Sequence, residues 1–487
     1  MVSIEIIKLF EMKRLIHTLC PLILLLFSCS SDTGKTNTSA ETKDTVIAKE
    51  KFAKGQIIEN VVNLTNASQS YALYLPSTYS PDKIYPVIYA FDAHGTGKLP
   101  VAMYKNLAEK YGYILIGSNN SKNGTAWDET QIIANNLFSD SQLRLSINTT
   151  RIYLLGFSGG ARVANGLCIT NGGIAGVICC GAAAPAANNK DPRSNYTFLG
   201  ICGNSDFNYI EMRKYDMVDL AGRPVKHAFI EFDGKHEWPK EEIMNDAFLW
   251  TELGAMRKDP KFKNDVFVKE NILLYSNQIK KAQQNNKIFE VYNLVRKTIN
   301  FFDGLTDLKK YYDIYNPLKD NAEIDKNLKQ EEVIWKQESE LKAFYGEAFQ
   351  SKNMDWWKQE VASMNKIIKN GKTDEVLMNK RILDYLSLVA YMQTTSALKQ
   401  QNLLASKMFC QIYLIIDPTN SEAHYLNAIT LAIEGKDKET IVALNEAIKN
   451  GFKDITRLES DNAFIKMRQT EEFKVILKKV NDENMEQ

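Results

Sequence analysis

From Gln56 to about Leu253, short apolar runs rich in β-branched and aromatic residues alternate with segments of helical periodicity. Most of these runs have no polar face, so strands made from them must be covered on both sides. After a leading antiparallel pair at Gln56–Val62 and Tyr71–Tyr74, the expected strands are Pro86–Phe91, Tyr113–Gly117, Arg151–Leu155, Ile174–Cys180, Tyr196–Cys202 and Val225–Phe232. The pattern predicts an α/β fold, a mainly parallel sheet with helices on both faces.

The strand signals stop after about Arg257, and the remaining sequence is long, charged and amphipathic, which predicts an all-α region. We therefore expect an α/β domain over 53–257, a helical region over 258–380 and helical repeats over 381–487. Asp417-Pro418-Thr419-Asn420 is followed by small or apolar residues at Ala423, Ala428, Gly435, Leu444 and Ala447. This spacing resembles a tetratricopeptide repeat, and Phe344–Asn370 and Asp461–Val480 are expected to supply flanking helices.

The N-terminal segment carries one long apolar run, Leu15 to Ser28, which follows Lys13-Arg14. Its 14 residues are too few to cross a bilayer as a helix. A basic start, an apolar centre and a small residue before Cys29 resemble a bacterial lipoprotein signal over 1–28. That resemblance implies lipidation of Cys29, a disordered polar tether over 29–52, and a protein held at the bacterial cell envelope by its lipid anchor alone, or secreted. The alternative, an ordinary buried helix, is disfavoured by Pro21.

Composition and missing motifs exclude several function classes. Sixty Lys and Arg against 59 Asp and Glu give a formal charge of +1, so nucleic acid is a poor candidate partner. The sequence contains no H-E-x-x-H, no P-loop and no G-x-G-x-x-G after a strand, so no metal or cofactor is expected. The five cysteines after Cys29 lack C-x-x-C spacing and are expected to be core thiols, a Cys168–Cys202 or similar bridge being the alternative: Cys168, Cys179, Cys180, Cys202 and Cys410.

The motif with the most chemical content is Gly156-Phe157-Ser158-Gly159-Gly160, which lies between an expected strand and an expected helix. A serine on such a sharp turn projects its hydroxyl from the end of the sheet. A Cβ atom at Gly156 or Gly160 would collide with the neighbouring strand or helix. The Gly159 N–H then lies at a helix N-terminus, where an oxyanion can be bound. Ser158 is therefore the candidate nucleophile and Gly159 a candidate oxyanion donor.

A serine needs a neighbouring base, which is usually histidine. Beyond the signal the chain has four histidines: His94, His227, His236 and His424. His424 lies in the repeat region and His227 inside an apolar strand, whereas His236 lies in a Gly- and Pro-bounded loop directly after the last strand. Asp206 follows the preceding strand and precedes the histidine, as the third member of a triad should. The alternative for Asp206 is a solvated Asn-Ser-Asp turn.

These three strand ends resemble those of the α/β-hydrolases, in particular the small lidless branch of dienelactone hydrolases, carboxylesterases, feruloyl esterases and polyhydroxyalkanoate depolymerases. The resemblance covers about residues 56–255 and implies Ser158 as nucleophile, Asp206 as orienting acid and His236 as base. The stretch from Phe91 to Gly97 looks like the family's His-Gly loop, which implies a second oxyanion donor at Thr96 and a structural role for His94.

Two readings of function follow. The first is an envelope-tethered serine hydrolase that cleaves small or polymeric carboxylic esters through an acyl-enzyme on Ser158, with a serine peptidase as the alternative within this class. The second is an adaptor lipoprotein that binds a protein partner through its helical repeats, with an inactive hydrolase-like domain. Ser158, Asp206 and His236 after three separate strands favour the enzyme.

Overall fold

The computed structural model describes residues 51–186 and 196–485. The expected signal, Cys29 and nearly all of the expected tether lie outside these residues. Within the described ranges, no helix combines the length and the apolar character needed to cross a membrane.

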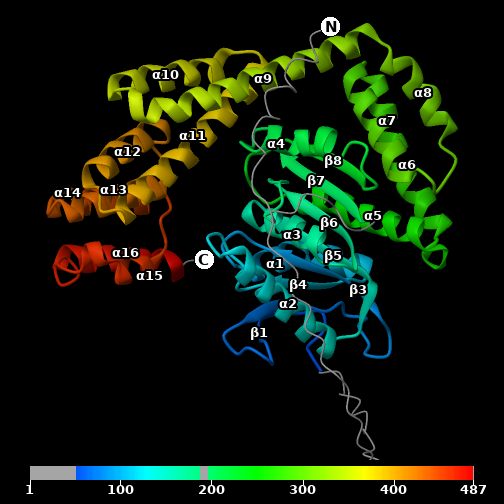
Figure 1. The fold of residues 1–487 in the computed structure, drawn as a ribbon, viewed down its shortest axis with the longest axis horizontal. Coiled ribbons are helices and arrows are strands. Elements are labelled where there is room, and N and C mark those ends of the chain that lie inside the picture. Colours follow the sequence, from blue (N-terminus) through cyan, green and yellow to red (C-terminus); the bar gives the residue numbers. More distant parts are fainter. Residues whose placement is uncertain (1–50, 187–195, 486–487) are drawn as a thin grey trace, which may run out of the picture. The chain divides into compact units, whose positions relative to one another are not determined.

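Eight strands form one sheet in the order β1-β2-β4-β3-β5-β6-β7-β8 (Figure 1). The strands are β1 (Ile57–Val62), β2 (Ser70–Tyr74), β3 (Tyr85–Phe91), β4 (Ile114–Ser118), β5 (Ile147–Phe157), β6 (Ile174–Cys180), β7 (Thr197–Gly203) and β8 (Lys226–Phe232). β2 pairs antiparallel with β1 and β4, and all other pairs are parallel. Every expected strand is present. β5 begins earlier than expected because Ile147 pairs with Tyr85 ahead of a polar, irregular stretch.

Helices cover both faces of this sheet, because alternate residues of its central strands point to opposite sides. In β3, Ile88 and Ala90 join one apolar core while Val87 and Tyr89 join the other. α1 (Lys98–Tyr111) and α5 (Glu241–Lys258) cover the first face. α2 (Trp127–Arg144), α3 (Gly159–Thr170) and α4 (Tyr209–Lys214) cover the second. The expected α/β class, a mainly parallel sheet with helices on both faces, is confirmed. We call β1–β8 with α1–α5 the sheet domain.

The later helices, α6 to α16, form what we call the helical region. They are α6 (Asp265–Gln284), α7 (Ile288–Phe302), α8 (Lys309–Lys319), α9 (Ala322–Ser351), α10 (Met354–Asn370), α11 (Thr373–Lys399), α12 (Leu403–Ile416), α13 (Ser421–Ile433), α14 (Asp437–Lys449), α15 (Ile455–Ser460) and α16 (Glu471–Met485). Asparagine side chains accept hydrogen bonds from first-turn N–H groups of five of them, at Asn264, Asn321, Asn353, Asn402 and Asn420.

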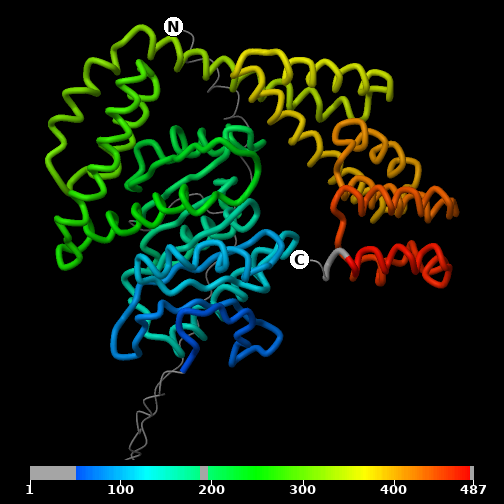
Figure 2. Tube along the Cα trace, turned by 180° about the vertical axis from the view of Figure 1, so that it is seen from behind, coloured from blue at the N-terminus to red at the C-terminus, as the bar shows by residue number. Residues whose placement is uncertain are grey.

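The helices of the helical region divide between two apolar cores. α6, α7 and α8 share the apolar core of α5 and the sheet, where the rings of Trp250 and Phe301 lie 4.9 Å apart. From the second half of α9 onward, the helices build a core of their own, and successive helices lie beside one another in both views (Figures 1 and 2). Ala423, Ala428 and Ala447 are buried in it, as expected for small residues at helix crossings. The tetratricopeptide assignment stays a prediction.

The five cysteines within the described ranges are buried free thiols: Cys168, Cys179, Cys180, Cys202 and Cys410. Their expected role as core residues is confirmed, and the alternative bridge between Cys168 and Cys202 is absent. Burial raises the pKa of Cys168 and Cys202 well above the ordinary thiol range, so both are poor nucleophiles.

Candidate active site

Ser158 occupies the turn between β5 and α3 with a backbone φ of +53°, a conformation that costs a non-glycine residue about 1–3 kcal/mol. The surrounding glycines allow it. A Cβ atom at Gly156 would lie 2.2 Å from the Gly160 carbonyl oxygen, and one at Gly160 would lie 2.0 Å from the Phe91 carbonyl oxygen. The strand and helix therefore approach as closely as the motif predicts, and the turn is held against its local preference.

The structure brings together the three residues expected to form the triad. Ser158 Oγ lies 2.9 Å from His236 Nε2, and His236 Nδ1 lies 2.9 Å from Asp206 Oδ2. A carboxylate can only accept, so Nδ1 carries the proton and Nε2 is left to accept from the serine hydroxyl. Asp206 is 1% exposed and its Oδ1 accepts from the Asn208 N–H at 2.8 Å. Asp206 thus lies in a buried, hydrogen-bonded turn rather than a solvated one.

The imidazole of His236 packs against two aromatic rings. The ring centroid of Phe157 lies 4.7 Å away and that of Phe207 lies 4.2 Å away. Gly181, with φ of +66°, leaves room for the pair, because a Cβ there would lie 3.1 Å from Asp206 Oδ2 and 3.2 Å from His236 Cε1. Gly181 was not among the residues singled out from the sequence, since it follows an apolar strand without any motif.

The loop after β3 is organised by Asp92, a carboxylate that is 2% exposed. Its Oδ1 accepts from the His94 N–H at 2.9 Å and the Thr96 N–H at 3.4 Å, and its Oδ2 accepts from Trp238 Nε1 at 3.1 Å. Burial raises the pKa of Asp92, but its hydrogen bonds to His94 and Trp238 outweigh that effect and leave the pKa below the ordinary value. One carboxylate thereby ties the candidate oxyanion loop to the loop that carries His236. The sequence signal for Asp92 is a charged residue at the end of an apolar strand.

The candidate oxyanion donors differ in their surroundings. Gly159 begins α3, and a Cβ there would lie 1.7 Å from Asn123 Oδ1, so a side-chain oxygen lies directly against it. Thr96 is exposed and its N–H points to Asp92 at the long distance given above. The roles of both N–H groups stay proposals.

The other three histidines that the structure describes have partners away from Ser158. His94 Nδ1 lies 3.7 Å from Asp92 and its side chain is 85% exposed. His227 Nδ1 lies 2.8 Å from Asp216, and His424 Nε2 contacts the Pro418 carbonyl oxygen. Each has the ordinary structural surroundings expected of it.

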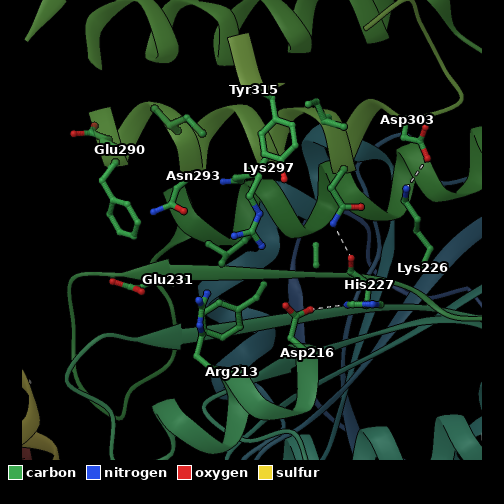
Figure 3. Close-up of a pocket in the computed structure, with 18 of the residues that line it drawn as sticks. Arg213, Asp216, Lys226, His227, Glu231, Glu290, Asn293, Lys297, Asp303 and Tyr315 are labelled. Atoms are coloured by element: carbon green, nitrogen blue, oxygen red, sulfur yellow. Dashed lines mark hydrogen bonds and ion pairs between the residues drawn. The ribbon is translucent and has the colours of Figure 1, made fainter. Parts of the chain in front are cut away.

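A polar cavity of about 840 Å³ lies elsewhere, along β8 and α7 (Figure 3). Its charges are largely paired, as the Lys226–Asp303 and His227–Asp216 contacts in the figure illustrate. None of Ser158, Asp206 and His236 lines it. The cavity is therefore separate from the candidate active site.

No protein-family model matches the chain, and no curated protein matches it. Among solved structures, the chain is similar to the feruloyl esterase module of Clostridium thermocellum, with 16% identity over 40% of this chain and 87% of that one, at a TM-score of 0.33. It is similar to an S-formylglutathione hydrolase from Agrobacterium tumefaciens, with 14% identity, 38% and 88% coverage and a TM-score of 0.32. It is also similar to a ferulic acid esterase from Anaeromyces mucronatus, with 17% identity, 40% and 87% coverage and a TM-score of 0.32.

Proposed function

We propose that this chain is a serine hydrolase that cleaves carboxylic esters through an acyl-enzyme on Ser158. The observation that supports it most is the continuous hydrogen-bonded chain from Ser158 through His236 to the buried Asp206, built on a turn held at positive φ. An ordinary Ser-Gly turn needs neither the strained backbone nor an aligned imidazole.

In the acylation step, Ser158 Oγ attacks the ester carbonyl carbon while His236 Nε2 takes the hydroxyl proton. The carbonyl oxygen becomes an oxyanion, for which Gly159 and Thr96 are the proposed N–H donors. As the tetrahedral adduct collapses, the bond to the alcohol oxygen breaks and the imidazolium returns its proton to the leaving alcohol. Asp206 stabilises the imidazolium and keeps Nδ1 protonated throughout.

Deacylation repeats these steps with water. His236 Nε2 removes a proton from water, the resulting oxygen attacks the acyl carbon, and the second adduct expels Ser158, which regains its proton. The products are a carboxylic acid and an alcohol, and the enzyme returns to its starting state.

A series of p-nitrophenyl esters of increasing acyl length, assayed beside peptide substrates, tests the proposal. We expect turnover of at least one ester that disappears in Ser158→Ala. Cleavage of peptides with no ester turnover would favour a serine peptidase with the same residues. No turnover of either substrate class by the folded chain would contradict the proposal and favour an adaptor that acts through its helical repeats.

We also propose that Cys29 is lipidated and holds the protein at the cell envelope, with the tether over 29–52 between anchor and enzyme. Growth of the expressing cells with a fatty-acid analogue should label the wild type and leave Cys29→Ala unlabelled and free in the aqueous phase of a detergent partition. Equal labelling and equal partition of the two proteins would contradict the anchor.

A further inference from the structure

The loop that carries Asp206 is contacted by side chains from outside the sheet domain. Arg381 in α11 donates from Nη1 to the Asn204 carbonyl oxygen at 2.7 Å. Lys342 in α9 donates from Nζ to the Phe207 carbonyl oxygen at 2.8 Å. These two carbonyl groups flank Asp206, so the helical region contacts the loop on both sides of the candidate acid.

The two cations are themselves fixed by one buried carboxylate. Glu338 is 0% exposed, and its Oε2 accepts from Arg381 Nε at 2.8 Å and lies 2.7 Å from Arg381 Nη2. Its Oε1 lies 2.7 Å from Lys342 Nζ. A buried carboxylate left without any cationic partner would strongly destabilise the folded state, so Glu338 must keep at least one of these two cations beside it. We call Glu338, Arg381 and Lys342 the acid-loop clamp.

The clamp complements the hydrogen bonds that the loop makes with the sheet domain. The Asn204 N–H donates to the Phe232 carbonyl oxygen and the Ser205 N–H to the Gly234 carbonyl oxygen, both at 2.9 Å. These bonds use N–H groups, whereas the clamp binds carbonyl groups. The loop is thus held through its donors by the sheet domain and through two acceptors by the helical region.

Contacts beside the clamp keep α9 and α11 against the same surface. The Arg381 guanidinium lies 5.0 Å from the ring centroid of Tyr209, the first residue of α4. Arg213 in α4 lies 3.7 Å from Glu331 in α9 and 5.2 Å from the ring centroid of Trp335. The clamp is therefore part of an extended contact rather than an isolated pair of surface bridges.

We propose that Glu338, Arg381 and Lys342 are positioning residues of the hydrolase, which hold Asn204–Phe207 so that Asp206 stays aligned with His236 Nδ1. This inference rests on the proposed function, because alignment matters only if His236 acts as a base. Loss of alignment reduces the stabilisation of the imidazolium, and displacements of about 1 Å at such a site lower rates by as much as about 100-fold.

Lys342→Met is the variant of choice, because Glu338 keeps Arg381 as its partner and the buried carboxylate stays paired. Lys342→Arg is the conservative variant and retains a cationic donor. Lys407→Met is the matched control, since Lys407 lies 3.0 Å from Glu434, which keeps Lys436 at 2.7 Å. It likewise removes one of two cationic partners of a glutamate, at a more exposed pair, from helices that carry no part of the clamp.

We expect Lys342→Met to lower kcat for a p-nitrophenyl ester by about 10- to 100-fold with little change in KM. The acidic limb of its kcat/KM profile should move to lower pH, because the imidazolium of His236 is less stabilised. Lys342→Arg should recover most of kcat, and Lys407→Met should match the wild type. Hydrogen exchange should accelerate in Lys342→Met over residues 204–209 and nowhere near Lys407.

Two outcomes are separable. A wild-type chain without ester turnover would refute the proposed function, whatever the exchange data show. Unchanged exchange over residues 204–209 in Lys342→Met, or kcat equal to that of Lys407→Met with an unmoved acidic limb, would overturn the positioning role while the proposed function stands.

Discussion

Ser158 and Gln401 have nearly the same unusual backbone φ, +53° and +56°, in very different surroundings. Gln401 is exposed and lies just beyond the end of α11, where a left-handed residue commonly ends a helix. Ser158 lies between a buried strand and a helix, with its side chain hydrogen-bonded to His236. A positive φ ends a helix in one region and accompanies a reactive group in the other, so the surroundings rather than the φ value identify the site.

The two regions also differ in how far their paired charged side chains are exposed to solvent. Many ion pairs of the helical region join neighbouring turns in solvent, as Lys329 and Asp325 do with 72% and 57% of their side chains exposed, and such pairs add little stability. In the sheet domain Asp206 is buried with a histidine partner. Glu338 is the buried exception in the helical region, and it lies at the contact with the Asp206 loop. Buried carboxylates, Asp206 and Glu338, thus lie on both sides of the contact between the helical region and the Asp206 loop.

The largest expected difference between the regions is catalytic. Ser158→Ala and His236→Ala should each lower kcat by about 10⁴- to 10⁶-fold, and the double variant should be little worse, because the two residues act as a unit. Asp206→Asn should cost somewhat less than either. Lys329→Ala in the helical region should leave the rate unchanged. Initial rates with a p-nitrophenyl ester measure all five, and additive losses in the double variant would argue against a shared mechanism.

The next effect concerns which helices share the apolar core of the sheet domain. Phe301 in α7 and Phe464 near the C-terminus are both 0% exposed, and truncation of either should cost about 3–5 kcal/mol. Phe301→Ala should shift the loss of ester hydrolysis to lower denaturant concentration, because α7 shares the core of α5. Phe464→Ala should leave the midpoint for loss of activity unchanged. It should lower only the denaturant midpoint for loss of helix, which is followed by circular dichroism. Equal effects of the two variants on the denaturant midpoint for loss of activity would contradict two separate cores.

Next, glycine-to-alanine substitutions should change the free energy of unfolding in opposite directions in the two regions. Gly160→Ala places a Cβ 2.0 Å from the Phe91 carbonyl oxygen and should destabilise the fold by at least about 1–3 kcal/mol. Gly346 lies inside α9, before its last turn, with open space around it, and Gly346→Ala should stabilise the fold by about 0.5–1 kcal/mol. Urea denaturation measures both, and two changes of the same sign would contradict the close approach at Ser158.

The last effect depends on pH. Burial, opposed by Lys235 and His236 and reinforced by Asp417 and Asp206, raises the pKa of Asp384 to about 6. A raised carboxyl pKa destabilises the folded state as pH rises from about 4 through 6. Asp384→Asn should therefore be more stable than the wild type by about 1 kcal/mol above pH 7, after allowance for solvent screening, and equal to it near pH 4. Melting temperatures at the two pH values decide this, and a gain at pH 4 would contradict it.

The sheet and the triad follow from sequence for a common reason. Continuous apolar runs predict parallel strands, and the carboxyl ends of parallel strands meet at one edge, so Ser158, Asp206 and His236 had to converge. Only the exact strand limits differ, as at the polar start of β5. Asp92 carries a visible signal, a charge at the end of an apolar strand, while its link to Trp238 depends on tertiary packing.

Sequence patterns could not predict the acid-loop clamp or how far the apolar core of the sheet domain extends. Glu338 and Lys342 are four residues apart on an amphipathic helix and look like an ordinary exposed bridge, since only the position of α11 and the Asp206 loop buries them. Likewise, the strand signals end near Arg257 although the apolar core does not, because helical periodicity in α6 to α8 does not reveal which surface a helix covers.

Reaction of the full chain with a fluorophosphonate probe, followed by mass spectrometry of the modified peptide, tests the central claim that the chain carries an activated serine. The account predicts one covalent adduct, on Ser158, that forms rapidly in the wild type, far more slowly in His236→Ala and not at all in Ser158→Ala. A folded wild type that stays unmodified, or that reacts as fast without His236, would contradict it.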